Sequence, residues 1–345
     1  MKKPTLCLIF GGKSREYDIS LLSVDCILRH IDREKYKICL LGITREGKWY
    51  IYKGDESKIR DGEWVREKQK YDIMLSPNTG ELIYNDGENK VVFPDIVLPI
   101  VHGDYGEDGK ISGLFDIMGI SCKGIGADGA ALTVNKYITK LIAKEISVPV
   151  ADFYVLRKGD ICDKEKILTY AEGLEYPLFV KASSCGSSVG VFKVKREEEL
   201  FCRIEEAFKF SELVLMEKCV YGTETEIAAL WKNGELHLGK IGQIKHTSDF
   251  YDYYAKYKKG DSVCVIPAKI SEECEKIIRK YAKSLFFAAM CRGFCRMDFF
   301  VTEDEKVIFN EINTIPGFTL GSMFPMLMSD NTRGIGGLID DMLMN

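Results

Sequence analysis

The chain has 345 residues, 46% of them hydrophobic, and its 48 basic and 52 acidic side chains give a net charge of −4 at pH 7. This length suits two or three domains of roughly 100–200 residues each, and the near balance of charge excludes the basic surface that nucleic-acid binding requires. Twelve cysteines without zinc-like spacing predict reduced thiols in a cytoplasmic protein, and no apolar run suits a signal peptide or the ~20 residues of a membrane helix.

The first third of the chain alternates strand-like and helix-like runs. Short apolar runs predict strands at residues 5–10, 38–43, 49–52 and 95–101, and apolar residues at helical spacing predict helices at residues 19–31 and 111–118. Because strands that alternate with helices usually form parallel sheets covered on both faces, we expect an α/β domain here.

A glycine-rich junction at residues 124–129 separates this region from the rest of the chain. Beyond it we expect helices at residues 133–146, 197–208 and 272–290, and strands near Phe153 and at residues 178–181, 213–217, 224–230, 293–301 and 306–312. A polar, aromatic loop at residues 245–261 precedes the last of these helices.

Two glycine motifs in the first half of the chain are poor candidates for nucleotide binding. Gly12-Lys13-Ser14 looks like the end of a Walker A loop, but the first glycine of that motif would fall on Cys7, inside an apolar strand. Residues 124–129 match G-x-G-x-x-G, but no acidic residue closes a second strand about 20 residues later. An interdomain turn is the better interpretation of that run.

A third glycine motif is a better candidate for phosphate binding. A strand that ends at Lys181 leads into residues 182–190, which are nearly all small. Small residues let backbone N–H groups approach anionic oxygens, and the lysine adds a point charge. An ordinary hairpin is the alternative, although it does not need so many small residues. Farther along, Glu217 and Glu224 suit the base and ribose of a nucleotide, or simply flank a turn.

Two strands near the C-terminus carry pairs of polar side chains. Arg296 and Asp298 are two residues apart on one strand, as Glu311 and Asn313 are on the next, so each pair shares a face. If the strands pair, one surface presents two carboxylates, an amide and a guanidinium, and such oxygen ligands suit Mg²⁺. The alternative is two amphipathic strands with wet polar faces.

Taken together, these residues resemble the ATP-grasp ligases, and more closely the D-alanine–D-alanine ligases. The resemblance rests on residues 11–21, 102–103, 106–109, 186–190, 250–257 and 310–322, which span nearly the whole chain. It implies an α/β protein in which an ATP-grasp fold, α+β in its C-terminal part, follows a parallel-sheet domain. We therefore expect an N-terminal substrate domain at 1–124, a central ATP-grasp domain at 125–222, and a C-terminal ATP-grasp domain with the metal site at 223–345.

The resemblance also implies the reaction and its requirements. Such ligases are cytoplasmic, usually dimeric enzymes that use ATP and Mg²⁺ or Mn²⁺ to join two D-alanines for peptidoglycan. For this chain we expect two metal ions. The first D-alanine attacks the γ-phosphate to form an acyl phosphate, and the amine of the second then displaces phosphate. We expect small-molecule substrates and a homodimer, with neither nucleic-acid nor membrane partners.

Roles for individual residues follow from the same resemblance. The residues expected to contact ATP are Lys136, Lys181, Ser187, Ser188, Glu217, Lys218 and Glu224. The metal ligands would be Asp298, Glu311 and Asn313, and the oxyanion would face Arg296 and the backbone N–H of Gly317. The contacts to the two amino acids would be Glu16 and His102 for the first, and Lys256, Ser322 and Met323 for the second.

In the family, Tyr257, Ser187 and Glu16 form a hydrogen-bonded trio that ties the loop at 245–261 over the site. Closing the loop keeps water from the acyl phosphate. Taken singly, Glu16 would be an ordinary acid at a helix N-terminus, and His102 a structural histidine at a strand end. Their catalytic interpretation therefore depends on the joint pattern.

Three positions depart from the usual pattern of the family. Ala182 stands where proline is common, Cys185 where many members carry an acidic or other residue, and Asn135 where aspartate is usual. None of the three touches the expected chemistry, but Cys185 and Asn135 leave the affinity for ATP open.

Two other functions compete with D-alanine ligation. A D-alanine–D-serine ligase of the glycopeptide-resistance kind is one, because residues 16–18 and 42–49 resemble such enzymes. Tyr257 argues against a D-lactate-using relative, and Met323 favours alanine, although an apolar pocket rejects an added hydroxyl only ~100-fold. A nucleotide-binding protein without ligase activity is the other, and Arg296 beside the metal trio argues against it.

Overall fold

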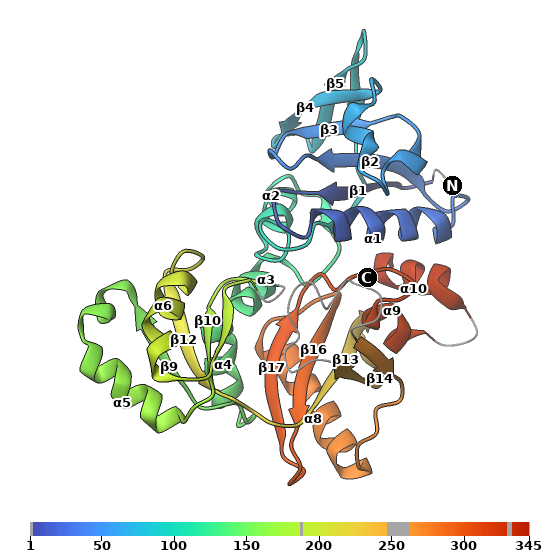
Figure 1. Ribbon diagram of the computed structural model, residues 1–345. Coiled ribbons are helices and arrows are strands. Elements are labelled where there is room, and N and C mark those ends of the chain that lie inside the picture. Colours follow the sequence, from blue (N-terminus) through green and yellow to red (C-terminus); the bar gives the residue numbers. More distant parts are fainter. Residues whose placement is uncertain (1–2, 187–188, 247–261, 330–332, 345) are drawn as a thin grey trace.

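The computed structural model describes residues 3–186, 189–246, 262–329 and 333–344, which form three β-sheets with helices packed on each. Figure 1 shows the N-terminal sheet at the top, and the second and third sheets below it on either side. The mixed α/β class expected from the sequence is confirmed.

An eight-stranded sheet occupies the N-terminal third, in the order β6-β5-β4-β3-β2-β1-β7-β8. Its four strands β2, β1, β7 and β8 are parallel, and the neighbours from β2 to β6 are antiparallel. Its elements are β1 (Thr5–Gly11), α1 (Tyr17–His30), β2 (Lys37–Ile43), β3 (Trp49–Tyr52), β4 (Lys70–Ser76), β5 (Glu81–Asn85), β6 (Asn89–Val92), β7 (Ile96–Ile100), α2 (Lys110–Ile117) and β8 (Ser121–Cys122).

The parallel part confirms the sequence prediction, whereas the antiparallel extension β4–β6 is absent from it. Met74 and Val91 are exposed apolar residues on the outer face of these strands, so the alternation of apolar and polar residues that marks a half-buried strand is blurred. In β1 the alternation separates two layers, because Leu8 packs on the side of α1 and Ile9 on the side of α2.

A four-stranded antiparallel sheet follows, in the order β11-β10-β12-β9. Helices α5 and α6 cover it, and the apolar residues between them form a core of their own around Val180 and Ile204. Its elements are β9 (Phe153–Arg157), α5 (Lys164–Leu174), β10 (Leu178–Ala182), β11 (Val191–Val194), α6 (Glu197–Ala207) and β12 (Leu213–Lys218).

The third sheet is antiparallel and five-stranded, in the order β15-β14-β13-β16-β17. Helices α3, α4 and α8 share a core with one of its faces, and α9 and α10 pack on the other. The elements are α3 (Ala127–Val134), α4 (Lys136–Glu145), β13 (Thr223–Lys232), β14 (Glu235–His246), β15 (Ser262–Val265), α8 (Glu272–Ala288), β16 (Phe294–Val301), β17 (Val307–Asn313), α9 (Met323–Met328) and α10 (Gly334–Leu343).

The single helix predicted at residues 133–146 is two helices, α3 and α4. Asn135 separates them and caps α4, because its Oδ1 accepts hydrogen bonds from the backbone N–H groups of Tyr137 (3.1 Å) and Ile138 (3.2 Å). The glycine run at residues 124–129 is a turn only in its first part, because α3 begins at Ala127. Gly129 lies inside α3, where a Cβ would come within 2.7 Å of the Met290 carbonyl oxygen.

The first and third sheets share one hydrophobic core. Phe10 and Leu21 of the N-terminal unit belong to the same cluster as Phe294, Phe318 and Phe324 of the C-terminal unit. Figure 1 shows α1 lying above α9 and α10, at the junction of the two units.

All twelve cysteines fall within the described ranges, and none of them is in a disulfide there. Among the described residues, no helix is both long enough and apolar enough to cross a membrane.

Candidate active site

A row of carboxylates crosses the third sheet. Asp298 of β16 lies opposite Glu226 of β13 on one side and opposite Glu311 of β17 on the other. Arg296 lies opposite Asn313 in the same register. The predicted pairing of the two polar strands is therefore confirmed, and it brings all four of their polar side chains to one face of the sheet.

Arg296 is the cation of this row. Its Nε and Nη2 each donate to a carboxylate oxygen of Asp298 at 2.8 Å, and Nε also lies 3.1 Å from Oε2 of Glu226. Burial favours a neutral Arg296, but the two carboxylates outweigh it and raise the pKa of the guanidinium. Burial also favours the neutral form of Asp298 and therefore raises its pKa, and the positive charge of Arg296 opposes that effect. The arginine is thus a permanent positive charge.

The residues expected to hold a metal fit that role by their chemistry. In the described part of the chain, no three His, Cys, Asp or Glu side chains form a metal cluster, and the expected set instead combines Asp298 and Glu311 with an amide. Oδ1 of Asn313 is buried and has no hydrogen-bond partner within the described structure. A buried oxygen of this kind is costly unless something binds it. Two carboxylates and an amide oxygen suit a hard cation such as Mg²⁺.

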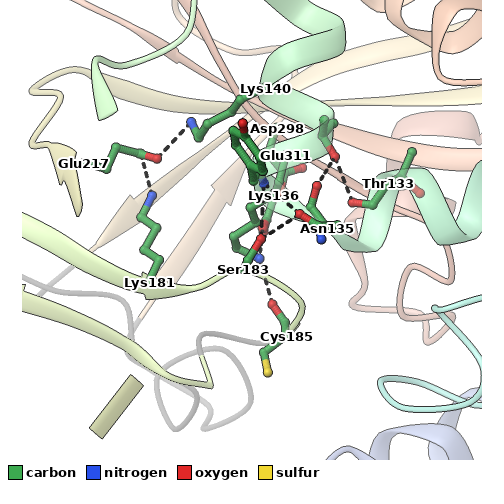
Figure 2. A network of polar contacts seen from close by, with 12 residues as sticks. Thr133, Asn135, Lys136, Lys140, Lys181, Ser183, Cys185, Glu217, Asp298 and Glu311 are labelled. Carbon is green, nitrogen blue, oxygen red and sulfur yellow. Dashed lines mark hydrogen bonds and ion pairs between the residues drawn. The ribbon is translucent and has the colours of Figure 1, made fainter. Parts of the chain in front are cut away.

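Lys136 connects this row to the phosphate loop. It is the first residue of α4, and its Nζ lies 3.0 Å from Oε2 of Glu311 while donating to the backbone carbonyl of Cys185 at 2.7 Å (Figure 2). A second bond fixes the loop to the same helix end, because the hydroxyl of Ser183 donates to Oδ1 of Asn135 at 2.6 Å. The third sheet and the loop after β10 therefore meet at the start of α4.

Glu217 of β12 lies between two lysines. Its Oε1 is 2.6 Å from Nζ of Lys181 on β10, and its Oε2 is 2.9 Å from Nζ of Lys140 on α4 (Figure 2). Burial opposes ionisation of this carboxyl, but the two ammonium groups outweigh burial and lower its pKa to about 2. Two residues expected to bind ATP, Lys181 and Glu217, are thus in direct contact.

The N-terminal unit contributes two more carboxylates. A Cβ placed on Gly186 would lie 2.8 Å from Oε2 of Glu107 and 3.8 Å from Oε2 of Glu16, so both side chains reach the phosphate loop. Glu16 is placed by the turn after β1, where its backbone N–H is 3.2 Å from the Ser14 hydroxyl. Burial and the neighbouring Glu16 raise the pKa of Glu107 well above its ordinary value. An ammonium group would relieve this repulsion.

His102 anchors the loop that carries Glu107. Its Nδ1 lies 2.7 Å from the carbonyl oxygen of Ile315, and its Nε2 lies 3.3 Å from the hydroxyl of Ser23. Burial lowers the pKa of His102 despite the opposing charge of Glu16. A neutral ring that donates from Nδ1 and accepts at Nε2 satisfies both contacts. His102 therefore joins the first unit to the segment after β17.

The segment after β17 brings Gly317 next to Ser322. A Cβ on Gly317 would come within 3.1 Å of the Ser322 hydroxyl, which accepts from the backbone N–H of Thr319 at 3.0 Å. Met323 is the first residue of α9 and is buried. Its Cε packs against Gly242, where an added Cβ would lie only 2.5 Å from it. Lys218 differs from the other expected ATP contacts, because its Nζ pairs with Glu175 at 3.0 Å in an exposed position.

Four expected site residues lie outside the described residues: Ser187, Ser188, Lys256 and Tyr257. The loop predicted to close over the site coincides with that part of the chain, apart from its first two residues.

Three residues of the site are absent from the sequence prediction. Lys140 follows Lys136 by four residues and Glu226 follows Glu224 by two, so helical and strand periodicity place each on the face of its predecessor. The two spacings therefore indicate in the sequence that Lys140 and Glu226 lie beside predicted site residues. Glu107 lies in the run 106–109 that carries the family resemblance, but no spacing places it beside Glu16, because only folding brings the two loops together.

A cavity of about 360 Å³ lies apart from these residues, on the α2 side of the first sheet. It is lined by the turns after β1 and β2 and by the start of α2, with Lys13, Glu46, Trp49 and Lys110 among its residues. None of the expected catalytic side chains lines it. The candidate site is therefore an arrangement of polar groups between sheets, distinct from this cavity.

The arrangement of the sheets and charged groups defines the class of protein. A four-stranded antiparallel sheet with a lysine and a small-residue loop meets a five-stranded sheet with a row of carboxylates, as in ATP-grasp ligases. Two family models match the sequence, described as D-ala D-ala ligase N-terminus over residues 5–125 and D-ala D-ala ligase C-terminus over residues 142–344. The chain belongs to the D-alanine–D-alanine ligase family, whose members are ATP-dependent enzymes.

Curated relatives match over the full length. A D-alanine–D-alanine ligase of Thermoanaerobacter sp. (strain X514) is 38% identical over 349 residues, covering 99% of this chain and 96% of the relative. D-alanine–D-alanine ligase B of Clostridium tetani is 38% identical over 345 residues, covering 99% and 93%.

Solved structures of similar proteins include both acceptor types. The VanG D-Ala:D-Ser ligase of Enterococcus faecalis superposes with a TM-score of 0.90 at 32% identity, covering 99% of this chain and 98% of that one. The D-alanine–D-alanine ligase of Coxiella burnetii has a TM-score of 0.85 at 29% identity, covering 99% and 93%.

Proposed function

We propose that the chain joins two D-alanines to D-alanyl-D-alanine for peptidoglycan, at the expense of ATP. The observation that carries the proposal is the position of Lys136, which contacts Glu311 and the Cys185 carbonyl at once. This lysine links the loop suited to phosphates with the carboxylates suited to a metal. Phosphoryl transfer requires those two elements side by side.

The first step is activation of a carboxylate, which is a poor electrophile. The carboxylate of the first D-alanine attacks the γ-phosphorus of ATP, forming an acyl phosphate and releasing ADP. Lys136 and Lys181 bind the phosphate oxygens, and Glu217 and Glu224 bind the base and ribose. Asp298, Glu311 and Asn313 would hold Mg²⁺ or Mn²⁺, and we propose two such ions, whose charge would neutralise that of the phosphates.

The second step forms the amide. The amine of the second D-alanine, after losing a proton, attacks the acyl carbon, and the tetrahedral intermediate then expels inorganic phosphate. Arg296 and the backbone N–H of Gly317 stabilise the oxyanion, and one such donor contributes ~3–4 kcal/mol in other enzymes. Glu16 holds the ammonium group of the first substrate, and Ser322 with Lys256 holds the carboxylate of the second. Tyr257, with Ser187 and Glu16, holds the loop closed.

A D-alanine–D-serine ligase is the second candidate. The similarity to the VanG D-Ala:D-Ser ligase, at a TM-score of 0.90, favours it. Met323 favours alanine if its side chain packs against that of the acceptor, because an apolar neighbour leaves a serine hydroxyl without a partner.

Product analysis tests both candidates. The enzyme is incubated with ATP, Mg²⁺ and D-alanine, and in a second reaction with equal concentrations of D-alanine and D-serine, and dipeptides and phosphate are measured. We expect one phosphate per dipeptide and mainly D-alanyl-D-alanine in both reactions. A preference for D-serine would overturn the acceptor assignment, and phosphate release without dipeptide would overturn the ligase.

We also propose three features that rest on the family: a cytoplasmic location, a homodimer, and the domain division 1–124, 125–222 and 223–345. ATP and peptidoglycan precursors are cytoplasmic, which supports the first. Light scattering tests the second, since a dimer has twice the 39.1 kDa mass of the chain. One sheet falls in each proposed domain, which supports the third, although α3 and α4 at the start of the central stretch pack on the third sheet. Limited proteolysis near the two boundaries tests the division.

A further inference from the structure

Lys140 is a buried lysine to which the proposed mechanism gives no role. It lies on α4, one turn after Lys136, and only 1% of its surface is exposed. Removing an ammonium group from water is costly unless an opposite charge compensates for it. The compensating charge is Glu217, whose Oε2 lies 2.9 Å from Nζ of Lys140.

Glu217 has a different cation on each of its two oxygens. Lys181 contacts Oε1 at 2.6 Å and Lys140 contacts Oε2, and Figure 2 shows the carboxylate between the two ammonium groups. Glu217 itself is 3% exposed, so water contributes little to its solvation. A carboxylate that needed one counterion would be satisfied by Lys181, and the second lysine therefore calls for an explanation.

The two lysines differ in what they can do. Lys181 lies on β10 directly before the phosphate loop, and the proposed function has its Nζ bind phosphate oxygens of the nucleotide instead of Glu217. Lys140 cannot follow, because it is enclosed on a helix. If Glu217 had only Lys181, nucleotide binding would take away the single counterion of a buried carboxylate, and an unpaired buried charge is strongly destabilising.

We propose that Lys140 is a positioning residue, the fixed counterion of Glu217, which lets Lys181 exchange from Glu217 to the nucleotide. The inference rests on the proposed ATP site and adds a residue to it. Lys140 touches neither ATP nor the amino acids, and acts through Glu217. Its charge keeps Glu217 ionised and in place for the base while Lys181 contacts ATP.

The variant Lys140→Met tests this role, with dissociation constants for ATP and for a non-hydrolysable analogue measured by calorimetry. We expect about a tenfold weaker affinity, equivalent to ~1.4 kcal/mol, and a matching rise in KM for ATP. The value of kcat at saturating ATP and the KM for D-alanine should stay within about twofold of wild type. Lys140→Arg, which keeps the charge, should restore most of the affinity for ATP.

Lys144→Met is the matched control. Lys144 lies one turn farther along α4, is exposed, and contacts the ring of Phe153 with its Nζ 4.4 Å from the ring centre. The same chemical change there should leave nucleotide affinity unchanged. A loss equal to that of Lys140→Met would assign the effect to the helix surface and overturn the proposal.

A double-mutant comparison separates positioning from packing, and it holds even if the single variant is unstable. In Glu217→Gln the buried charge is gone, so adding Lys140→Met should change the affinity for ATP by less than about twofold. An equal loss in both backgrounds would show that Lys140 acts by packing, and wild-type affinity in Lys140→Met would show that it does not act at all. Either result overturns the inference. Wild-type protein that binds ATP without making dipeptide would overturn only the proposed reaction.

Discussion

The arginine and the lysines of the site are held by partners of opposite sign, and most of these pairs are buried. Arg296 has Asp298 and Glu226, Lys136 has Glu311, and Glu217 has two lysines. Each pair fixes the position of a side chain before any ligand binds. Substitution of a partly exposed residue of the site should therefore lower activity with little change in stability. Substitution of a buried one should lower both.

Glu311→Gln should lower ligation by about a hundredfold or more, because even groups that only support metal ligands cost 10–100-fold when removed. Stability should change little, since Glu311 is partly exposed and glutamine keeps the size of the side chain, so that no cavity forms. Dipeptide formation at saturating ATP and Mg²⁺ and thermal unfolding are measured together. Asp304→Asn, an exposed neutralisation in the turn between β16 and β17, is the control. Turnover near that of wild type would remove Glu311 from the metal site.

His102 should make the folded state less stable in mild acid. Burial lowers its pKa, so between the ordinary value near 6.5 and the lower folded value, the unfolded chain binds a proton that the folded chain does not. The free energy of unfolding therefore falls as pH decreases through this window. Urea unfolding at pH 7.5 and 5.5 should show a smaller decrease for His102→Asn than for wild type. His237→Asn, at an exposed position of β14, should keep the wild-type decrease, and an equal slope in all three proteins would refute the assignment.

At the scale of elements, the start of α4 organises the site. Asn135 caps the helix and accepts from Ser183, and Lys136 and Lys140 project from the same helix to two different carboxylates (Figure 2). The break between α3 and α4 is what allows a cap in the middle of an apolar run. One short helix thus positions both the phosphate loop and the third sheet.

Asn135→Ala should destabilise the protein by about 1–2 kcal/mol, because it leaves the first N–H groups of α4 without their acceptor. It should also weaken ATP binding, since Ser183 loses its partner at the mouth of the loop. Asn135→Asp keeps an oxygen at the cap and should be near wild type in both respects. Chemical denaturation and calorimetry measure the two effects. Equal stability of the alanine and aspartate variants would mean that the cap contributes nothing.

At the scale of the molecule, the first and third sheets behave as one unit because they share a core, and the second sheet has its own core. The contacts that cross between them at the site are polar bonds, such as that from Lys136 to the Cys185 carbonyl, and an edge contact between the rings of Tyr137 and Phe153. Such contacts can open and reform more easily than a shared hydrophobic core. The second sheet is therefore the unit that can change position when a nucleotide enters.

Core truncations should reveal this division. Phe324→Ala removes a fully buried ring that contacts Phe294 and Phe318, and should cost about 3–5 kcal/mol. Hydrogen exchange should then rise in β1, α1 and β13 together. Ile204→Ala, on α6, should raise exchange in the second sheet and leave β1 as in wild type. Faster exchange throughout the chain in both variants would mean that the molecule unfolds as a single unit.

The sequence by itself determined the strands of the parallel core, the polar pairs on β16 and β17, and the small-residue loop after Lys181. These signals are local, because side-chain direction alternates along a strand and small residues mark a close backbone approach. Resemblance across nearly the whole chain then determined the family. The antiparallel strands β4–β6 and the cap at Asn135 were not determined in this way, since exposed apolar residues blur one pattern and a continuous helical period hides the other.

Only the tertiary structure decided which charges meet. Lys140 and Glu217 are 77 residues apart in the sequence, and Glu107 approaches Glu16 only through the folded loops after β1 and β7. Glu226 joins the carboxylate row because β13, distant in sequence from β17, pairs with β16. Such pairings depend on how separate elements pack, and the cost of burying a charge is settled only when its partner arrives. That is why the sequence could identify the ligase but not the counterion that holds Glu217 in place.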